Sequence, residues 1–253
     1  MIGRFSIAWS FLTAIPFPFS EKGNLPPEVM GRALPAFPWV GLALGLILAA
    51  ADRLLNILLP PVMVSLSVLF LLVLLTRGLH LDGLADTIDG LQGRNREESL
   101  RIMKEGTIGA FGATGLFFVL GFKIAGLASL PPGEAVRALL IMPVIGRWSF
   151  VTLMAFFPYG RPEGGLGAPF ISHAGIREWA WATLFTLLIV LSIAPFRGIG
   201  VAGTALLFSW IAGRYFTRRL GGITGDTIGA TGEVIETLCL IQWNVYQHFH
   251  LAK

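Results

Sequence analysis

Residues 68–90 read VLFLLVLLTRGLHLDGLADTIDG and join two segments of opposite character. The first part is a continuous apolar run, and the second carries three aspartates, Asp82, Asp86 and Asp89. Ionisable side chains are costly in lipid, and they usually mark a functional site where a membrane segment carries them. The join therefore predicts a polar, functional site at the end of a hydrophobic segment.

The composition of the whole chain agrees with a membrane location. Of its 253 residues, 54% are hydrophobic and only 13% are charged, whereas soluble domains carry about 25% charged residues. Several apolar runs approach the roughly 20 residues that a helix needs to cross a bilayer. The net charge of +4 comes without a basic stripe of interleaved aromatic residues, so we expect no nucleic-acid partner. The fold class predicted is all-α, a polytopic membrane helical bundle in contact with the lipid bilayer.

The hydropathy pattern predicts about 6–8 transmembrane helices within one domain that covers residues 1–253. The expected spans are 33–51, 62–75, 108–130, 135–157, 178–194, 200–215 and 234–249. The amino end, IGRFSIAWSFLTAIPFPF, is too interrupted for a span and is typical of an amphipathic helix at the membrane interface. No removable signal peptide is apparent. The single cysteine, Cys239, excludes an internal disulfide and is expected to be a small buried hydrophobe.

The distribution of Lys and Arg predicts the orientation of the chain, because these residues are in excess in cytoplasmic loops. With the amino end inside, thirteen of the 19 Lys and Arg residues fall on the cytoplasmic side and four fall on the other. The remaining two, Lys123 and Arg147, lie within spans. The two stretches that contain most of the aspartates are then both expected at the cytoplasmic face.

The spacing of Asp82, Asp86 and Asp89 places their carboxylates on one face of a helix. At about 100° per residue, the second and third lie about 40° and −20° from the first. Like charges on one helix face repel each other, so a cation that neutralises them would explain the cluster. Carboxylate oxygens favour Mg²⁺, Ca²⁺ or Mn²⁺. The rival interpretation is a solvated helix face, but such faces usually mix Glu, Lys and Ser, whereas this one carries the small residues Gly83, Ala85 and Gly90.

A second stretch, GGITGDTIGATGEVIET at residues 221–237, has a similar character. Asp226 and Glu233 are seven residues apart and share a helix face, whereas Glu236 is displaced by about 80° and could be solvated. Thr224 and Thr227 offer hydroxyl groups as ligands or hydrogen-bond donors. If this stretch packs beside the first one, Asp226 could complete a second metal position.

Between the two stretches lies GRNREESLRIMKEGTIGAFG at residues 93–112. Asn95 followed by Glu98 is typical of a helix N-cap, which predicts a short helix over 96–105 that ends at Gly106. Arg94, Arg101 and Lys104 would then flank the aspartates. Cations beside a carboxylate-bound divalent ion are the arrangement that phosphoryl transfer requires, although anchoring at the cytoplasmic face is a rival role for them. The backbone N–H groups of GTIGAFG could also contact a phosphate.

Two charges fall within the expected spans. Arg147 in PVIGRW is costly in lipid and is expected to face a polar interior. Lys123 could snorkel to the interface instead. His80 lies about 200° from Asp82 on a continuous helix, so we expect it to be structural rather than a ligand.

The motifs TRGLHLDGLADTIDGL, IMKEGTIGAFG, PVIGRW, GRPEGGLG and LGGITGDTIGATGEV, in this order, resemble those of the adenosylcobinamide-GDP ribazoletransferases, also called cobalamin synthases. The resemblance covers about residues 76–236. It implies a bacterial integral enzyme of the cell inner membrane that joins adenosylcobinamide-GDP to α-ribazole, or its 5′-phosphate, with release of GMP. One departure is Glu105, where the family commonly has Asp.

The resemblance also implies roles for individual residues. Mg²⁺ would be the cofactor, and its ligands would be the carboxylates of Asp82, Asp86, Asp89 and Asp226. The substrate phosphates would contact Arg94, Arg101, Lys104 and Arg147, with Thr224 as a further substrate contact. A ribose hydroxyl would attack the phosphorus nearer cobinamide. Whether an aspartate or a water accepts its proton, how many metal ions bind, which base the lower ligand carries and whether a homo-oligomer forms stay open.

Two other classes of membrane protein share some of these sequence features. An alcohol phosphatidyltransferase also holds metals with aspartates, but its usual AR dipeptide after DG is missing here and the fourth aspartate lies far downstream. A cation-coupled transporter would carry repeated halves and carboxylates near the middle of the membrane. Neither feature is visible in the sequence.

Overall fold

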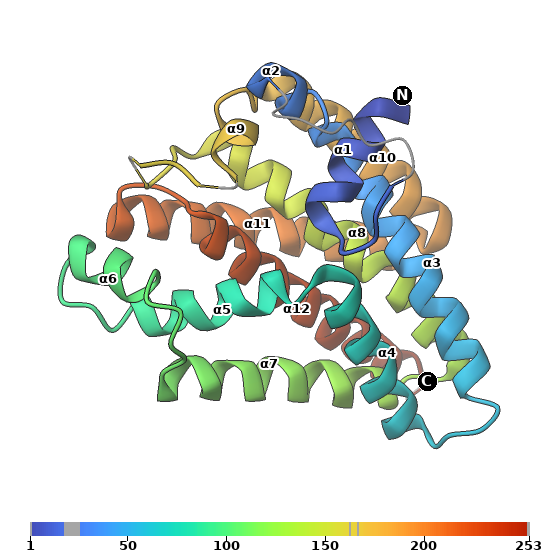
Figure 1. The fold of residues 1–253 in the computed structure, drawn as a ribbon. Coiled ribbons are helices and arrows are strands. Elements are labelled where there is room, and N and C mark those ends of the chain that lie inside the picture. The colour runs from blue at the N-terminus through green and yellow to red at the C-terminus, as the bar shows by residue number, and fades with distance from the viewer. Residues whose placement is uncertain (1, 18–25, 162, 166, 252–253) are drawn as a thin grey trace.

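The structure is a computed structural model that describes residues 2–17, 26–161, 163–165 and 167–251 (Figure 1). The described residues are helical, apart from loops and one isolated β-bridge, which confirms the predicted all-α class. In chain order the helices are α1 Ile2–Leu12, α2 Pro27–Gly31, the 3₁₀ helix η1 Leu34–Ala36, α3 Phe37–Leu55, α4 Pro61–Thr76, α5 Leu79–Gly90, α6 Arg96–Ile102, α7 Ala110–Ala128, α8 Pro132–Phe156, α9 Ala168–Ile171, α10 Ile176–Ile193, α11 Pro195–Leu220 and α12 Gly225–Leu251.

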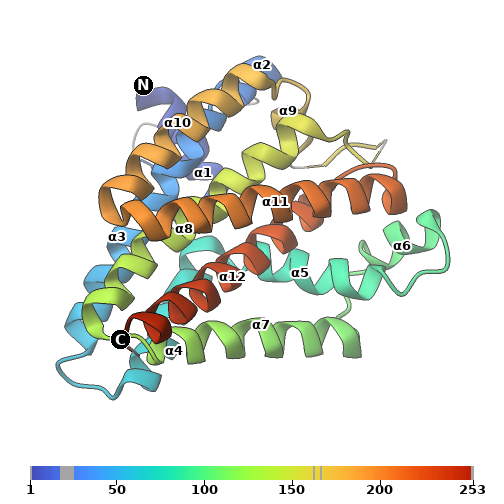
Figure 2. The ribbon, with the colours of Figure 1, turned by 180° about the vertical axis from the view of Figure 1, so that it is seen from behind.

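Helix α8 forms the centre of the bundle. It packs against α3, α10, α11 and α12, and most of its side chains are buried on every side. A helix that is apolar all round is expected in such a position. On one side of α8 lie α3 and α10, while α5, α7 and α12 form a second group (Figures 1 and 2). Helix α11 contacts α8, α10 and α12 and so connects the two groups.

Five helical segments are long and apolar enough to span a membrane: Pro27–Leu55, Ala110–Ala128, Pro132–Phe156, Ile176–Ile193 and Pro195–Leu220. A sixth is added if α4 and α5 count as one bent span, so six is the lower end of the expected range. Residues 234–249 are helical within α12, but that helix is not apolar enough to be among the five. Many large apolar side chains, such as Phe117, face outward, as lipid contact requires. The chain is therefore a multi-pass membrane protein.

The bend between α4 and α5 has a local cause. Arg77 and Gly78 both adopt positive φ angles, 56° and 65°, and the two helices meet at 90°. The N–H groups of Gly78 and Arg77 donate to the carbonyls of Val73 and Leu74, which is the hydrogen-bond pattern of a Schellman motif. The apolar run therefore stops at Thr76, and α5 starts in a new direction with its aspartates.

Helix α1 forms at the amino end, as the sequence predicts. Its residues Ala8, Trp9 and Leu12 are buried, and the helix packs against α3. The loop that follows is tied to the end of α4, because the N–H of Ala14 donates to the carbonyl of Leu75 at 2.7 Å. This brings α1 to the α4–α5 bend, where it forms one wall of the site described next.

Candidate active site

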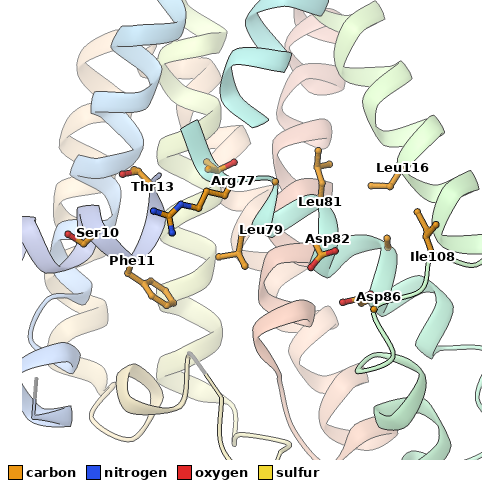
Figure 3. Close-up of a pocket in the computed structure, with 14 residues that line it drawn as sticks. Ser10, Phe11, Thr13, Arg77, Leu79, Leu81, Asp82, Asp86, Ile108 and Leu116 are labelled. Carbon is orange, nitrogen blue, oxygen red and sulfur yellow. The ribbon is translucent and has the colours of Figure 1, made fainter. Parts of the chain in front are cut away.

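Asp82 and Asp86 line a cavity of about 700 Å³ at the start of α5 (Figure 3). Neither carboxylate takes part in a hydrogen bond or an ion pair with any residue that the structure describes. The negative charge on Asp86 is repelled by the negative charges of Asp82, Asp226 and Asp89, which all lie near enough to interact with it. The cavity therefore presents two unpaired carboxylates in a strongly acidic setting.

The rest of the cavity wall is mainly apolar. It is lined by Phe11, Leu79, Leu81, Ala85, Ile108 and Leu116, together with Ser10, Thr13, Thr76, Arg77, Gly78 and Gly106. Arg77 is the cation among these lining residues. From the sequence we expected Arg77 only as a cytoplasmic charge. Its place three residues before His80, where the apolar run meets the acidic stretch, is a signal for a site residue.

The second aspartate stretch lies against the first. A Cβ atom on Gly83 would come within 2.8 Å of the Cα of Asp226, and one on Gly229 within 3.1 Å of the Cα of His80. Since only a missing side chain allows this approach, the two glycines let α5 and α12 pack backbone to backbone. The juxtaposition of the two stretches is as we expected from the sequence.

Asp226 is paired with a residue that the sequence analysis did not select. Its Oδ2 accepts a hydrogen bond from Nη2 of Arg161 at 2.6 Å, and both side chains are largely buried. Arg161, Asp226 and Tyr159 line a second cavity of about 140 Å³, which shares Phe11 and Leu79 with the larger one. Burial raises the pKa of the Tyr159 phenol, so this group stays protonated near neutral pH.

Thr224 has a structural position at the start of α12. It is fully buried, and its Oγ1 accepts from the N–H of Thr227 at 3.2 Å, while Oγ1 of Thr227 accepts from the N–H of Thr224 at 2.8 Å. This reciprocal pair caps the helix. Thr224 also lies 3.5 Å from Oδ2 of Asp226. Its hydroxyl therefore serves the helix and Asp226 rather than an open substrate surface.

Asp89 also has partners within the protein. Its Oδ2 accepts from the N–H of Gly109 at 2.7 Å and its Oδ1 from the N–H of Gly112 at 2.8 Å, at the first turn of α7. A carboxylate at a helix N-terminus satisfies free N–H groups and offsets the helix dipole. The N–H groups of GTIGAFG that we expected to contact a phosphate therefore include two that bind Asp89.

These pairings determine which carboxylates are free. Within the described residues, no group of three or more His, Cys, Asp or Glu side chains is arranged so that it could hold a metal ion. The physical reason is that Asp226 points to Arg161 and Asp89 to α7, which leaves Asp82 and Asp86. Two unpaired carboxylates with hard oxygen atoms fit a divalent cation such as Mg²⁺.

The cations of the α6 region lie on the surface rather than in the cavity walls. Helix α6 forms over Arg96–Ile102 with Asn95 as its N-cap, because Oδ1 of Asn95 accepts from the N–H of Glu98 at 2.9 Å. Arg101 is paired with Glu105, and Lys104 is paired with Glu163. The side chain of Arg94 is exposed. None of these three cations, which are among the four predicted phosphate contacts, lines either cavity.

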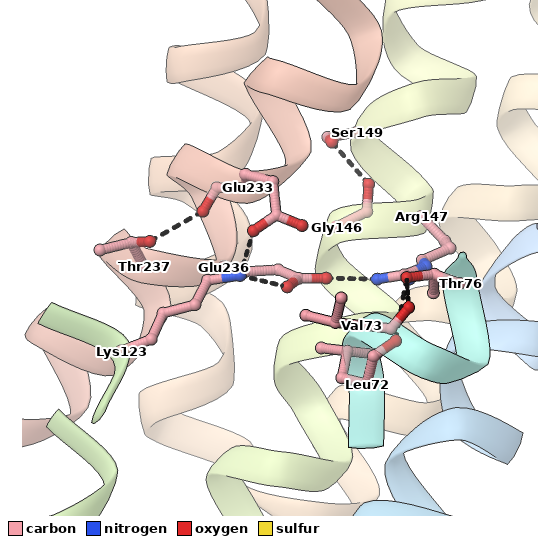
Figure 4. A network of polar contacts seen from close by, with 10 residues as sticks. All are labelled: Leu72, Val73, Thr76, Lys123, Gly146, Arg147, Ser149, Glu233, Glu236 and Thr237. Carbon is pink, nitrogen blue, oxygen red and sulfur yellow. Dashed lines mark hydrogen bonds and ion pairs between the residues drawn. The ribbon is translucent and has the colours of Figure 1, made fainter. Parts of the chain in front are cut away.

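Arg147 belongs to a buried ionic cluster inside the bundle (Figure 4). It is paired with Oε1 of Glu236, while Nζ of Lys123 is 2.7 Å from both Glu233 and Glu236. The two cations balance the two carboxylates, which is what burial of charge requires. Arg147 faces a polar interior, as we expected, but it lines neither cavity. Lys123 does not snorkel, and Glu236 is not solvated.

His80 is a buried residue of α5 next to the site. Its ring is buried and packs on Phe150, with 4.9 Å between ring centroids. It also lines the smaller cavity. These contacts agree with the structural role that we expected for His80.

Comparison with known proteins gives consistent matches along the chain. The sequence model of the family described as cobalamin-5-phosphate synthase matches residues 4–244. Among curated proteins, the adenosylcobinamide-GDP ribazoletransferase of Geotalea daltonii is 40% identical over 242 residues, which is 95% of this chain and 96% of that protein. The enzymes of the same name from Syntrophobacter fumaroxidans and Desulforamulus reducens are 37% and 36% identical, over 95% and 94% of this chain and 97% and 94% of theirs. No solved structure matches the chain.

Proposed function

This chain belongs to the cobalamin-5-phosphate synthase family and is a transferase, and we propose that it joins adenosylcobinamide-GDP to α-ribazole, or its 5′-phosphate, with release of GMP. The names of the curated relatives and the order of the sequence motifs support these substrates. The apolar outer surface supports a place in the bacterial inner membrane. The excess of Lys and Arg supports an active site that opens to the cytoplasm.

The observation that carries this proposal is the pair of free carboxylates, Asp82 and Asp86, on the wall of the 700 Å³ cavity. The diphosphate bridge of adenosylcobinamide-GDP carries negative charge, and it cannot approach carboxylates without a cation between them. We propose that Asp82 and Asp86 would hold Mg²⁺, with Asp226 as a further ligand. When bound, Mg²⁺ would neutralise charge on the attacked and the leaving phosphate.

The protein's own contribution is then to bind the two substrates, to position them and to exclude water from them. A ribose hydroxyl of α-ribazole attacks the phosphorus nearer cobinamide and forms a new phosphorus–oxygen bond. The bond from that phosphorus to the bridging oxygen of the diphosphate breaks, and this oxygen leaves with GMP. The hydroxyl loses a proton in this step, and Asp82 and Asp86 are the unpaired carboxylates beside the cavity that could accept it, directly or through a water. The apolar wall formed by residues such as Phe11 and Leu116 suits the heterocyclic base of the nucleoside.

The set of phosphate contacts differs from the one that the resemblance implied. Arg94, Arg101 and Lys104 stay proposed contacts on the exposed side, where long side chains can reach a bulky substrate. We leave out Arg147 and Thr224 because their polar atoms already serve buried partners. Asp89 is left out of the metal ligands for the same reason. Arg77 is added because its side chain lines the larger cavity.

A membrane-fraction assay tests the proposed function. Membranes that contain the full chain are incubated with adenosylcobinamide-GDP and α-ribazole, and the release of GMP and the joined product are measured. We expect both to appear with Mg²⁺, to stop with EDTA, and to return when Mg²⁺ is restored. Membranes without the chain are the control. Absence of the joined product would overturn the substrate assignment, and full activity in EDTA would overturn the role of the metal.

A further inference from the structure

Arg161 is a largely buried cation at the site that has no role in the reaction proposed above. It lies in the loop between α8 and α9, and a parallel β-bridge between Tyr159 and Ile223 ties this loop to the turn between α11 and α12. The N–H of Gly160 donates to the carbonyl of Ile223, and the N–H of Ile223 donates to the carbonyl of Pro158, each at 2.8 Å. The bridge brings Arg161 and Asp226, which follow it on the two parallel segments, to the same place.

The pairing of Arg161 with Asp226 leaves the buried Nε of Arg161 without an acceptor. Its Nη2 is 2.6 Å from Oδ2 of Asp226, and its side chain is 14% exposed. Its Nε is buried and has no hydrogen-bond partner among the described residues. Buried N–H donors are usually satisfied, so an unused one on a residue that lines the smaller cavity indicates a place for an acceptor that the protein does not supply.

Arg161 also acts on the free carboxylates. Its charge attracts that of Asp86, while Asp82 and Asp226 repel each other across the contact between α5 and α12. A divalent cation between these carboxylates would be repelled by the guanidinium and would compete with it for Asp226. Asp226 therefore cannot bind the Arg161 guanidinium and a divalent cation equally tightly at the same time.

We propose that Arg161 is the built-in counter-ion of Asp226, that a divalent cation displaces it, and that the released guanidinium then binds a phosphate oxygen of the substrate's diphosphate. The inference rests on the proposed function for the identity of that diphosphate and for the divalent cation at Asp82, Asp86 and Asp226. A planar guanidinium with several N–H donors matches two phosphate oxygens, and its buried Nε would gain the acceptor that it lacks. Arg161 is thus a phosphate-binding residue that also prevents the empty carboxylate cluster from repelling itself.

Cation binding without turnover tests this inference. The purified full chain in lipid nanodiscs is titrated with Mn²⁺, and free Mn²⁺ is measured by electron paramagnetic resonance. We expect Arg161→Gln to bind Mn²⁺ roughly tenfold more tightly than the wild type, because a competing positive charge is removed. Arg161→Lys keeps the charge and should bind Mn²⁺ as the wild type does. Arg218→Gln, an exposed arginine that lines neither cavity, is the matched control and should change nothing.

The proposed contact between Arg161 and a phosphate oxygen is tested with inorganic pyrophosphate, which is added at saturating Mn²⁺. Pyrophosphate should bind several-fold more weakly to Arg161→Gln than to the wild type, although the metal binds more tightly. A purely structural role for Arg161 would give the opposite first result, namely unchanged or weaker Mn²⁺ binding together with a lower unfolding temperature in Arg161→Gln, and would overturn the inference. Equal Mn²⁺ affinities in wild type and Arg161→Gln, or no Mn²⁺ binding by the wild type, would also overturn it.

The inference and the proposed function can fail separately. A wild-type chain that releases no GMP from adenosylcobinamide-GDP, but shows the expected shifts in Mn²⁺ and pyrophosphate binding, would retain the inference and lose the proposed substrates. An active wild type whose Arg161→Gln variant shows no shift in Mn²⁺ binding would retain the function and lose the inference.

Discussion

Gly83 of α5 and Asp226 of α12 are in backbone contact, so close that a Cβ atom on Gly83 would lie 2.8 Å from the Cα of Asp226. This contact joins two stretches that are far apart in the chain into one acidic site. Since each stretch supplies different carboxylates, the consequences of removing them can be compared one residue at a time.

The free carboxylates of α5 should be required for turnover. Asp82→Ala or Asp86→Ala should lower the rate of GMP release by at least about 100-fold, because the charge that holds the cation is lost. The protein should remain in the membrane with an unfolding temperature no lower than that of the wild type, since neither side chain has a partner among the described residues and the two carboxylates repel each other. Glu97→Gln, an exposed carboxylate on α6 that lines neither cavity, is the matched control. Near-normal rates in both alanine variants at limiting Mg²⁺ would contradict the metal assignment.

The variant Asp226→Asn distinguishes two roles of Asp226, that of a metal ligand and that of a helix cap. The cap of α12 is Thr224, and an Asn at position 226 keeps the shape of the side chain. We therefore expect the helix to survive while the rate falls steeply and the Mg²⁺ concentration needed for half-maximal activity rises. The measurement is the rate of GMP release as a function of Mg²⁺ concentration. An Asp226→Asn enzyme with normal turnover and unchanged Mg²⁺ dependence would return the residue to a structural role.

Asp89→Asn should lower the stability of the protein and leave its Mg²⁺ requirement unchanged. The amide nitrogen cannot accept a hydrogen bond, so one N–H of Gly109 or Gly112 loses its acceptor, at a cost of about 1–3 kcal/mol. We expect a lower unfolding temperature in detergent and, for the fraction that stays folded, the Mg²⁺ requirement of the wild type. The reverse result, normal stability with a raised Mg²⁺ requirement, would make Asp89 a ligand after all.

The buried ionic cluster should behave as one charge-balanced unit. Lys123→Met alone leaves Glu233 and Glu236 with only Arg147 as counter-charge, which should cost about 3–5 kcal/mol of stability. Adding Glu233→Gln restores the balance, so the double variant should be more stable than the single one. Thermal unfolding of the four proteins in this double-mutant cycle measures the coupling. Additive effects would show that the residues do not act together.

The orientation of the chain can be tested by thiol labelling. Cys239 is the only cysteine and is buried, so new cysteines can be introduced against a low background. Glu97→Cys and Arg218→Cys, which are both exposed, should be shielded from an impermeant reagent added to intact spheroplasts. Leu58→Cys, in the exposed loop between α3 and α4, should be labelled rapidly. Labelling of either of the first two would reverse or split the orientation that the Lys and Arg excess predicts.

Much of the local structure could be predicted because its causes are local. Long apolar runs predict helices whose backbone groups are satisfied within each helix, as lipid requires. The four-three spacing of Asp82, Asp86 and Asp89 predicts one helix face, and Asn95 with Glu98 predicts the start of α6, both of which the structure contains. The small residues in both stretches also indicated the close packing of α5 on α12. In each case the signal lies within the same short stretch of the chain as the residues that it concerns.

The pairing of charges, in contrast, was decided by tertiary structure. Nothing near Asp89 in sequence indicates that its oxygens bind the N–H groups of Gly109 and Gly112, and nothing near Arg147 points to Glu236. A charge in a poorly hydrated interior takes whichever opposite charge or donor the packing brings within about 3 Å, and that neighbour comes from another helix. The sequence alone therefore determined the helical membrane class and the acidic stretches, whereas only the packed bundle decided that Asp82 and Asp86 stay free and that Arg161 holds Asp226.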